Sequence, residues 1–517
     1  MRYLVTGREM KDIDMRSIHE YGIPSLVLME RAALEVANEA ENLCAEKYCG
    51  ATSSRYKIWS VCGLGNNGAD GVAAARILHL RGYSTAVILP SVDGRMSDEM
   101  EIQLSIVEKL GIPILHSGDI SSDRCDVVID AVFGIGLKRT IEGAYEELIK
   151  LISTQKENYG AKVVSVDIPS GIDSDSGEIL GCTVCADKTV TFGEMKLGHV
   201  LFPGREYSGK VITAEIGFVP TDKNTAEAYA LAHTKEDLKR IPKRNSYSHK
   251  GNYGKILIAA GTKNMAGAAY FAAKAAYRTG AGLVKVLTVE ENRNTIHEKI
   301  PEAILATYST DWAVNESGAF KEYIRKQTDW ADVIVLGPGL GTEESSRLLV
   351  EAVLEHAYVP IVLDADAINL AARYPYLKNF FTENIILTPH LMECSRLSGK
   401  PVDGIRDSLI DTAREMAEQY GVTCVLKDAA TVIARKDGKL FVNTSGSASM
   451  AKGGSGDVLC GVIAGLLGLG MDECDAASLG VYVHGLAGET AARKYGVHSV
   501  LAGELADCIG EVINETV

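Results

Sequence analysis

The sequence predicts an α/β protein of two large domains, each built on a mainly parallel sheet with helices on both faces. Short apolar strands alternate with helical segments along the chain, which is the pattern of such sheets. The chain has 517 residues, more than one compact core accommodates. Polar, glycine-rich segments follow several strands, at the sheet edge where α/β domains bind their ligands.

The composition is that of a globular protein. Hydrophobic residues make up 46% of the chain, and 68 acidic residues against 53 basic ones give a net charge of −15. We therefore expect no nucleic-acid partner. No apolar run approaches the roughly 18 residues of a membrane span, and the start lacks the apolar region of a signal peptide, so no membrane partner is expected either. The eleven cysteines are scattered, which is typical of reduced thiols in a soluble, cytoplasmic protein.

A candidate phosphate-binding unit lies early in the chain. The apolar strand Lys57–Cys62 is followed by GLGNNGADG (Gly63–Gly71) and by a helix predicted at Val72–Arg81. Strand, glycine-rich turn and helix in this order are typical of phosphate-binding βα units. The side-chain carbonyls of Asn66 and Asn67 suit a hard cation or a ligand amide; a structural turn capped by these side chains is the alternative.

Two more polar segments follow strands in the first half: DAVFGIGLKRT (Asp130–Thr140) and DIPSGID (Asp167–Asp173). The carboxyl ends of parallel strands meet at one edge of a sheet, so three such segments predict a ligand site. Asp130 is either a core aspartate bonded to backbone or a cation ligand. Asp167, on a turn with exposed backbone, is better placed for proton transfer. Strands in this half are predicted at Lys57–Cys62, Thr85–Leu89, Asp126–Val132 and Lys162–Val166.

These motifs, together with ADKTVTFGEMKLG and an early LMERAA, resemble the N-terminal domain of the NAD(P)H-hydrate epimerase family over about residues 1–218. The resemblance implies a Rossmann-like three-layer domain over residues 1–220 that epimerises hydrated NADH or NADPH. It implies a K⁺ ion held by Asn67, Asp130 and Ser170, and Asp167 as a catalytic, proton-transfer residue. The family usually has glycine at the position of Ala69, whose methyl group demands an ordinary φ. The substrate contacts implied are Asn66, Asn67, Gly68, Ala69, Asp70, Gly134, Ile135, Gly136, Leu137, Lys138, Arg139, Thr140 and Asp167.

The strand–helix rhythm breaks before the second half, where residues 221–233 are predicted to be a linker. A helix lined with alanine and glycine, from about residue 265, is expected to pack closely. Polar segments again follow strands: GPGLGT (Gly337–Thr342), DADAIN (Asp364–Asn369), TPHLMEC (Thr388–Cys394) and KDAAT (Lys427–Thr431). Strands are predicted at Lys255–Ala260, Leu283–Val289, Val333–Leu336, Ile361–Leu363, Ile385–Leu387 and Thr423–Leu426.

The stretch GSASMAKGGSGDVLCG (Gly446–Gly461) precedes an apolar segment, Val458–Leu469, that predicts a buried helix. The small residues leave backbone N–H groups bare at the start of this helix, where a phosphate is favoured. Asp457 lies in the first turn and could act as a base. A tight turn with an acidic helix cap is the alternative.

The order GPGLG, DADA, TPH, K..T and GGSGD, with the later YVHGLAGETAA, resembles the ribokinase-like superfamily and specifically the NAD(P)H-hydrate dehydratase family. The resemblance covers about residues 240–515 and implies that residues 234–517 form a dehydratase domain. That domain would restore NAD(P)H from the S form of the hydrate with ADP as co-substrate, with Mg²⁺ beside the phosphates, giving AMP and phosphate. Asp457 would be its catalytic base. Implied contacts to the hydrate are Ala268, Gly339, His390 and Asp457, and to the nucleotide Lys427, Asp428, Ala429, Ala430, Thr431 and Gly456.

The two resemblances together imply a bifunctional isomerase and lyase that repairs hydrated NAD(P)H, expected to form a homo-oligomer. One alternative is a ribokinase-like small-molecule kinase fused to a nucleotide-binding module. A non-catalytic sensor or scaffold is another, against which the presence of Asp130, Asp167 and Asp457 argues. A dehydrogenase is disfavoured because GLGNNG (Gly63–Gly68), which has the GxGxxG spacing, is not followed about 20 residues later by an acidic residue at the end of the strand Thr85–Leu89.

Overall fold

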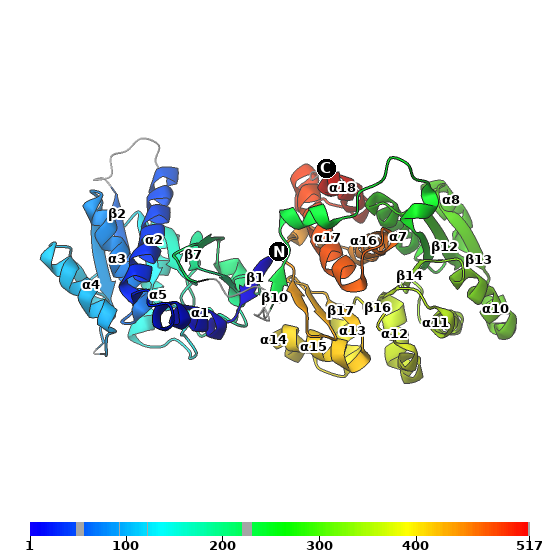
Figure 1. Ribbon diagram of the computed structural model, residues 1–517, viewed down its shortest axis with the longest axis horizontal. Helices are drawn as coiled ribbons and strands as arrows, with labels where there is room; N and C mark the ends of the chain where they lie inside the picture. Colours follow the sequence, from blue (N-terminus) through cyan, green and yellow to red (C-terminus); the bar gives the residue numbers. More distant parts are fainter. Residues whose placement is uncertain (48–55, 93, 121–122, 220–229, 515–517) are drawn as a thin grey trace. The chain divides into compact units, whose positions relative to one another are not determined.

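The computed structural model describes residues 1–47, 56–92, 94–120, 123–219 and 230–514 (Figure 1). The chain forms two compact units: an N-terminal unit, Tyr3–Tyr229, and a C-terminal unit, Ala230–Val517 together with Met1–Arg2. Of the linker predicted at 221–233, residues 221–229 lie outside the described residues. Ala230–Ala232 form strand β10 of the C-terminal unit.

The N-terminal unit is built on a parallel sheet with strand order β4-β3-β2-β5-β6-β7-β9. Strands β1 and β8 pair in parallel with each other and do not belong to this sheet. The strands are β1 (Arg2–Val5), β2 (Lys57–Cys62), β3 (Ser84–Leu89), β4 (Ile114–His116), β5 (Val127–Ala131), β6 (Lys162–Val166), β7 (Lys188–Phe192), β8 (Met195–Lys196) and β9 (Lys210–Ala214). The helices are α1 (Gly7–His19), α2 (Ser25–Lys47), α3 (Asn66–Leu80), α4 (Asp98–Lys109), α5 (Ala144–Tyr159) and α6 (Gly204–Tyr207).

Successive residues of β2 point to opposite faces of this sheet, and both faces are covered. Ile58 belongs to a core shared with α2, α3 and α4, whereas Trp59 belongs to a second core that includes Leu148 and Ile152 of α5. Because strand side chains alternate between faces, apolar residues at consecutive positions require a helical layer on each side. The predicted three-layer α/β architecture is confirmed.

The C-terminal unit has strand order β13-β12-β11-β14-β15-β16-β17-β18-β19-β10. Pairing is parallel from β13 to β17, antiparallel between β17, β18 and β19, and parallel between β19 and β10. The strands are β10 (Ala230–Ala232), β11 (Lys255–Ala259), β12 (Leu283–Val289), β13 (Ile304–Tyr308), β14 (Val333–Leu336), β15 (Ile361–Leu363), β16 (Ile385–Leu387), β17 (Thr423–Leu426), β18 (Val432–Arg435) and β19 (Leu440–Val442).

Helices cover both faces of this sheet as well (Figure 1). The helices are α7 (Ala266–Thr279), α8 (Arg293–Lys299), α9 (Thr310–Asn315), α10 (Ser317–Thr328), α11 (Glu344–His356), α12 (Ala365–Arg373), α13 (Leu391–Ser398), α14 (Val402–Asp407), α15 (Leu409–Tyr420), α16 (Ser455–Gly468), α17 (Glu473–Tyr495) and α18 (Ala502–Asn514). Among the described helices, none combines the length and apolar composition needed to cross a membrane.

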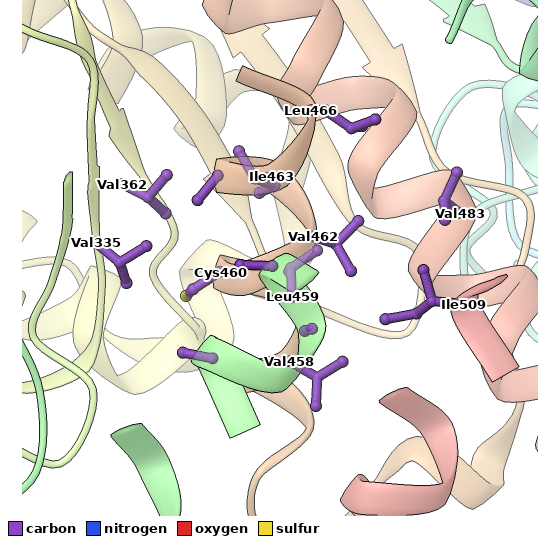
Figure 2. Packing of buried hydrophobic residues seen from close by; sticks show 14 of the residues in the cluster. Val335, Val362, Val458, Leu459, Cys460, Val462, Ile463, Leu466, Val483 and Ile509 are labelled. Atoms are coloured by element: carbon purple, nitrogen blue, oxygen red, sulfur yellow. The ribbon is translucent and has the colours of Figure 1, made fainter. Parts of the chain in front are cut away.

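Helix α16 is the centre of the C-terminal core, which confirms the prediction of a buried helix there. Val335 and Val362 of the sheet lie on one side of it, and Val483 of α17 and Ile509 of α18 lie on the other (Figure 2). Against α7 the packing is very close: a Cβ at Gly461 would lie 2.2 Å from the carbonyl oxygen of Ala272. The expected close packing of the alanine-rich helix α7 is therefore confirmed.

The predicted strands all occur, with ends that differ by no more than a residue. Several short strands were not predicted, among them β1, β4, β8, β10 and β19, because segments of two to four residues carry too little periodicity. The described cysteines are free thiols, including Cys182 and Cys185, which stand at CxxC spacing.

Candidate active sites

A cavity of about 810 Å³ lies at the carboxyl ends of β2, β5 and β6 in the N-terminal unit. All three predicted polar segments contribute to it. The predicted substrate contacts that line it are Asn66, Asn67, Asp70, Gly134, Ile135, Gly136, Leu137, Lys138, Arg139 and Asp167. Within the part of the chain that the structure describes, Gly68, Ala69 and Thr140 do not belong to the lining. The lining also contains residues that were not predicted, among them Asp14 and Lys196.

Helix α3 begins at Asn66, so Asn66–Gly71 form its first turns and the predicted start at Val72 was wrong. Asparagine and glycine are poor helix formers, and this concealed the start in the sequence. Ala69 is fully buried in the core, in helical backbone, so its methyl group is accommodated without strain. Gly68 has no such room, because a Cβ there would lie 1.9 Å from the carbonyl oxygen of Gly63.

Asp130 is fully buried at the end of β5 and is bonded to two serines. Its Oδ1 accepts from Ser170 Oγ (2.5 Å), and its Oδ2 accepts from Ser165 Oγ (2.7 Å) and Ser170 N (2.9 Å). Burial raises the pKa of Asp130, and the hydrogen bonds from Ser170 and Ser165 oppose that rise. In the described ranges no cationic side chain pairs with this carboxyl group, so its charge lacks a partner.

Asn67 and Ser170 both approach the segment after Asp130. Phe133 N donates to Ser170 Oγ (2.9 Å), and a Cβ at Gly134 would lie 2.8 Å from Asn67 Oδ1. The Asn67 Nδ2 atom is buried and has no hydrogen-bond partner among the described residues. The predicted ion ligands are thus brought together around Phe133 and Gly134. Within this group the Asn67 amide nitrogen makes no hydrogen bond to the described residues.

The loop from Gly134 to Thr140 is fixed through Lys138. Its Nζ donates to Asp173 Oδ2 (3.1 Å) and Asp175 Oδ2 (2.9 Å). Asp175 Oδ1 in turn accepts from the backbone N–H of Gly7 at the start of α1 (2.6 Å). Lys138 therefore holds the wall of the cavity.

Asp167 lies in the left-handed region, with φ +64°, which is strained for a residue other than glycine. Its carboxylate Oδ1 accepts from Lys196 Nζ (2.6 Å), a side chain with no exposed surface. Lys196 sits inside the ADKTVTFGEMKLG motif, but a lysine in an apolar stretch gave no sign of where its side chain would point.

Two other carboxyl groups of the cavity, Asp14 and Asp70, lie in the field of Asp167. Burial raises the pKa of Asp70 well above its usual range, and Asp167 adds to the shift. Burial and then Asp167 raise the pKa of Asp14 in the same way. Two carboxyl groups with raised pKa values thus share one cavity with Asp167, and perturbed carboxyl groups in a cavity are typical of general acid–base sites.

In the C-terminal unit, the glycine-rich stretch delivers the start of α16 to the carboxyl ends of the strands. Gly454 caps the helix with φ +94°, and Asp457 lies in the first turn. Burial raises the pKa of Asp457 to about 6; Asp364 adds to the shift and Lys427 opposes it. Among the described residues no group donates a hydrogen bond to Asp457, so its carboxylate is free to take a proton.

An ion pair between buried Asp364 and partly buried Lys427 lies beside this helix start. Asp364, 2% exposed, accepts at Oδ1 from Lys427 Nζ (2.7 Å) and Thr388 Oγ1 (2.7 Å). Burial lowers the pKa of Lys427, but the attraction to Asp364 and Glu393 and the hydrogen bond to Asp364 together outweigh burial, so the pKa is raised. A Cβ at Gly456 would lie 3.5 Å from Lys427 Nζ, so the predicted residues Lys427 and Gly456 are neighbours. The sequence indicated Asp364 only as part of the polar segment DADAIN, and its ion pair with Lys427 was not predicted.

The remaining predicted contacts fall into two groups. Gly339 and Ala268 lie together, since a Cβ at Gly339 would be 2.9 Å from that of Ala268. His390 pairs with Lys427 through backbone but uses its ring to cap α13: Nδ1 accepts from the N–H of Met392 (3.1 Å), and Nε2 lies 3.2 Å from Glu393 Oε1. His390 therefore has a structural role as the cap of α13.

Residues Lys427–Thr431 form the turn between the antiparallel strands β17 and β18. Thr431 Oγ1 donates to the carbonyl oxygen of Asp428 (3.1 Å) inside this turn. Asp428 is exposed, so water screens its charge. This turn also contains the other predicted nucleotide contacts, Asp428, Ala429 and Ala430.

His484, from the YVHGLAGETAA motif, is hydrogen-bonded to the first residue of α16. It is buried, which lowers its pKa to about 4, and its Nε2–H donates to the carbonyl oxygen of Ser455 (3.0 Å). A neutral histidine therefore fixes the first residue of α16.

Comparisons with known proteins cover both units. Residues 256–511 match the profile of the NAD(P)H-hydrate dehydratase family, and residues 25–198 match that of the YjeF-related protein N-terminus. A solved ribokinase-like superfamily protein from Enterococcus faecalis is 28% identical, with a TM-score of 0.50, over 57% of this chain and 99% of that chain. The ribokinase-like fold predicted for the second domain is thereby confirmed. A solved ADP/ATP-dependent NAD(P)H-hydrate dehydratase from Bacillus subtilis, co-crystallized with ATP and Mg²⁺, is 32% identical with a TM-score of 0.47, over 55% of this chain and 98% of that chain.

Two relatives align with nearly the whole chain. The bifunctional NAD(P)H-hydrate repair enzyme Nnr of Thermofilum pendens is 35% identical over 495 residues, which cover 94% of this chain and 92% of the relative. The enzyme of the same name from Escherichia coli is 32% identical over 488 residues, covering 94% and 89%. Both units described above thus occur together in these relatives, and the chain belongs to the family of bifunctional NAD(P)H-hydrate repair enzymes.

Proposed function

We propose that this enzyme interconverts the R and S forms of hydrated NADH and NADPH in its N-terminal unit and dehydrates the S form in its C-terminal unit. ADP would be the phosphoryl donor, giving AMP and phosphate. The observation that carries the proposal is that one chain holds two separate carboxylate sites, Asp167 in a cavity and Asp457 at an anion-binding helix start. We assign residues 1–220 to the epimerase domain and 234–517 to the dehydratase domain.

In the dehydratase reaction, Asp457 takes the proton of the ring hydroxyl, and the oxygen attacks the β-phosphorus of ADP as AMP leaves. The ring then loses phosphate and a proton, which restores the dihydronicotinamide double bond. Backbone N–H groups of Gly453–Gly456 face the charge that develops on the phosphoryl group. Mg²⁺ would neutralise phosphate oxygens. Ala268, Gly339 and His390 would contact the hydrate, and Lys427–Thr431 the nucleotide.

In the epimerase site, K⁺ would be held by Asn67, Asp130 and Ser170. The buried carboxylate of Asp130 has no cationic partner in the described part of the chain, and these ligands are oxygen donors of the kind hard cations prefer. The unpartnered Asn67 amide fits as well, because rotating it would turn Oδ1 toward the ion. Asp167 would transfer protons, and the cavity-lining residues between Asn66 and Arg139 would surround the substrate.

A single absorbance experiment tests the proposal. The purified chain is incubated with an equal mixture of R and S hydrates, and the dihydronicotinamide absorbance is followed. We expect complete conversion with ADP and K⁺, conversion that stalls near half without K⁺, and none without nucleotide; ATP in place of ADP measures donor preference. A phosphorylated product that accumulates without dihydronicotinamide would instead indicate the small-molecule kinase.

The free thiols fit a cytoplasmic location, which we also propose. A homo-oligomer remains a prediction, and light scattering on the purified chain would test it.

A further inference from the structure

The cavity of the N-terminal unit contains a fully buried lysine, Lys196, for which the proposed reaction has no role yet. We propose that Lys196 is a positioning residue for epimerisation: it holds Oδ1 of Asp167 and leaves Oδ2 as the oxygen that exchanges a proton with the substrate. This inference rests on the proposed epimerase function of the N-terminal unit.

The ammonium group of Lys196 uses all three of its N–H donors in hydrogen bonds within the protein. It donates to Asp167 Oδ1 (2.6 Å), Thr191 Oγ1 (2.8 Å) and the carbonyl oxygen of Phe192 (3.0 Å). Lys196 has no exposed side-chain surface, and its backbone is fixed by pairing with Val5 in the β1–β8 ladder. A lysine so completely satisfied cannot reach toward a ligand, so it acts through Asp167.

The two oxygens of Asp167 are not equivalent. Oδ1 also accepts from Thr191 Oγ1 (3.1 Å) and Phe192 N (3.4 Å), whereas Oδ2 has no hydrogen-bond partner among the described residues. Because Oδ1 already has three donors, Oδ2 is the oxygen with free lone pairs in the cavity wall. The carboxylate is thus oriented by its own domain before any substrate arrives.

The backbone of Asp167 is held by the same short segment. His199 Nδ1 accepts from Lys196 N (3.1 Å), so Nε2 carries the proton and donates to the carbonyl oxygen of Asp167 (2.9 Å). Burial, and then Lys196, lower the pKa of His199 to about 4, so this histidine stays neutral. The strained φ of Asp167 persists because its side chain and backbone are both held by Lys196–His199.

The charges around Asp167 make this lysine necessary. Asp14 of α1 and Asp70 of α3 lie close enough to Asp167 that its charge adds to the burial that raises the pKa of both. Lys196 is the cation bonded to Asp167, and His199 is neutral. A base must be ionised to accept a proton, and a cation bonded to a carboxylate favours the ionised form.

The test uses the full chain with a mixed-epimer substrate and measures epimerisation across pH. We expect Lys196→Met to lower kcat about a hundredfold with little change in KM. The acidic limb of the rate profile should move up by about one to three pH units, because the favourable charge is lost. A double variant with Asp167→Asn should be no slower than Asp167→Asn alone, since Lys196 acts only through Asp167.

Lys188→Met is the matched control: it removes a mostly buried lysine of the same unit that pairs with Glu39 and Glu46 and does not line the cavity. We expect this variant to keep the wild-type pH profile. Thr191→Val removes only the hydroxyl between Lys196 and Asp167, and should shift the acidic limb in the same direction by less. If Lys196→Met does not fold, the pH profile of Thr191→Val tests the inference in its place.

An unmoved acidic limb in Lys196→Met or Thr191→Val would overturn the inference. So would a double variant slower than Asp167→Asn by the full factor of Lys196→Met. Absence of epimerisation by the unmodified chain would contradict the proposed function itself, which separates the two failures.

Discussion

At the scale of single residues, Asp457 shows how this protein exchanges stability for reactivity. Burial and the nearby Asp364 raise its pKa to about 6, although Lys427 pulls it down. In the unfolded chain the carboxyl group ionises near its ordinary value of 3.8. The ionised form is therefore disfavoured on folding, and that cost is present above about pH 6 and absent below about pH 4.

We expect Asp457→Asn to stabilise the protein at pH 7 by about 1–3 kcal/mol, since a shift of roughly two pKa units corresponds to about 3 kcal/mol at most. The gain should vanish when unfolding is measured at pH 4. Denaturant unfolding at the two pH values, followed by circular dichroism, measures the difference. An equal gain at both would show that the carboxylate is not destabilised by burial.

The same substitution should lower nucleotide-dependent repair at least about a hundredfold, because it removes the proposed general base. Epimerisation should continue unchanged. In the unmodified enzyme the repair rate should fall as the pH drops below about 6, where Asp457 becomes protonated. Near-normal dehydration by Asp457→Asn would remove this residue from the base role.

At the scale of elements, the C-terminal site depends on how α16 begins. Gly454 has φ +94°, and a Cβ there would lie 2.8 Å from Ala502 Cβ and 2.9 Å from the Phe271 ring. Glycine is therefore required twice, by backbone conformation and by space. The close fit places the free N–H groups of the helix against the strand ends.

Gly454→Ala should destabilise the protein by about 2–4 kcal/mol, combining a left-handed backbone cost with overpacking. Gly470→Ala is the control, because Gly470 has the same φ of +94° with nothing within 4 Å of its Cβ position. It should cost only about 1–2 kcal/mol, the backbone part. Equal costs in thermal unfolding would mean that the contacts of Gly454 with Phe271 and Ala502 do not matter. Repair activity should fall in Gly454→Ala and should stay at the wild-type level in Gly470→Ala.

At the scale of the whole molecule, one reaction feeds the other without the two sites sharing residues. The full-length variant Asp167→Asn should convert about half of an equal epimer mixture with ADP and then stop. Adding the full-length variant Asp457→Asn should restart conversion, because its intact N-terminal unit replenishes the usable epimer. The substrate must first be shown not to epimerise by itself in that time. Complete conversion by Asp167→Asn alone would mean that Asp167 is not needed for epimerisation.

The sequence by itself determined the two α/β domains and the order of their main strands. Runs such as Lys57–Cys62 and Leu283–Val289 are apolar, short and bounded by glycine or polar residues, so local pattern was sufficient. It also indicated that polar segments meet at strand ends, because parallel strands align their carboxyl ends whatever lies between them.

Only the tertiary structure decided how the side chains within those segments are used. The cavity residues Lys196 and Asp14 come from parts of the chain far from Asp167, and no local spacing relates them. The helix start at Asn66 is held by its fit against Gly63, against the helix propensity of its own residues. Charge states were likewise decided by folding: the raised pKa values of Asp70 and Asp457 arise from burial and from carboxylates distant in sequence, and burial exists only once the chain is packed.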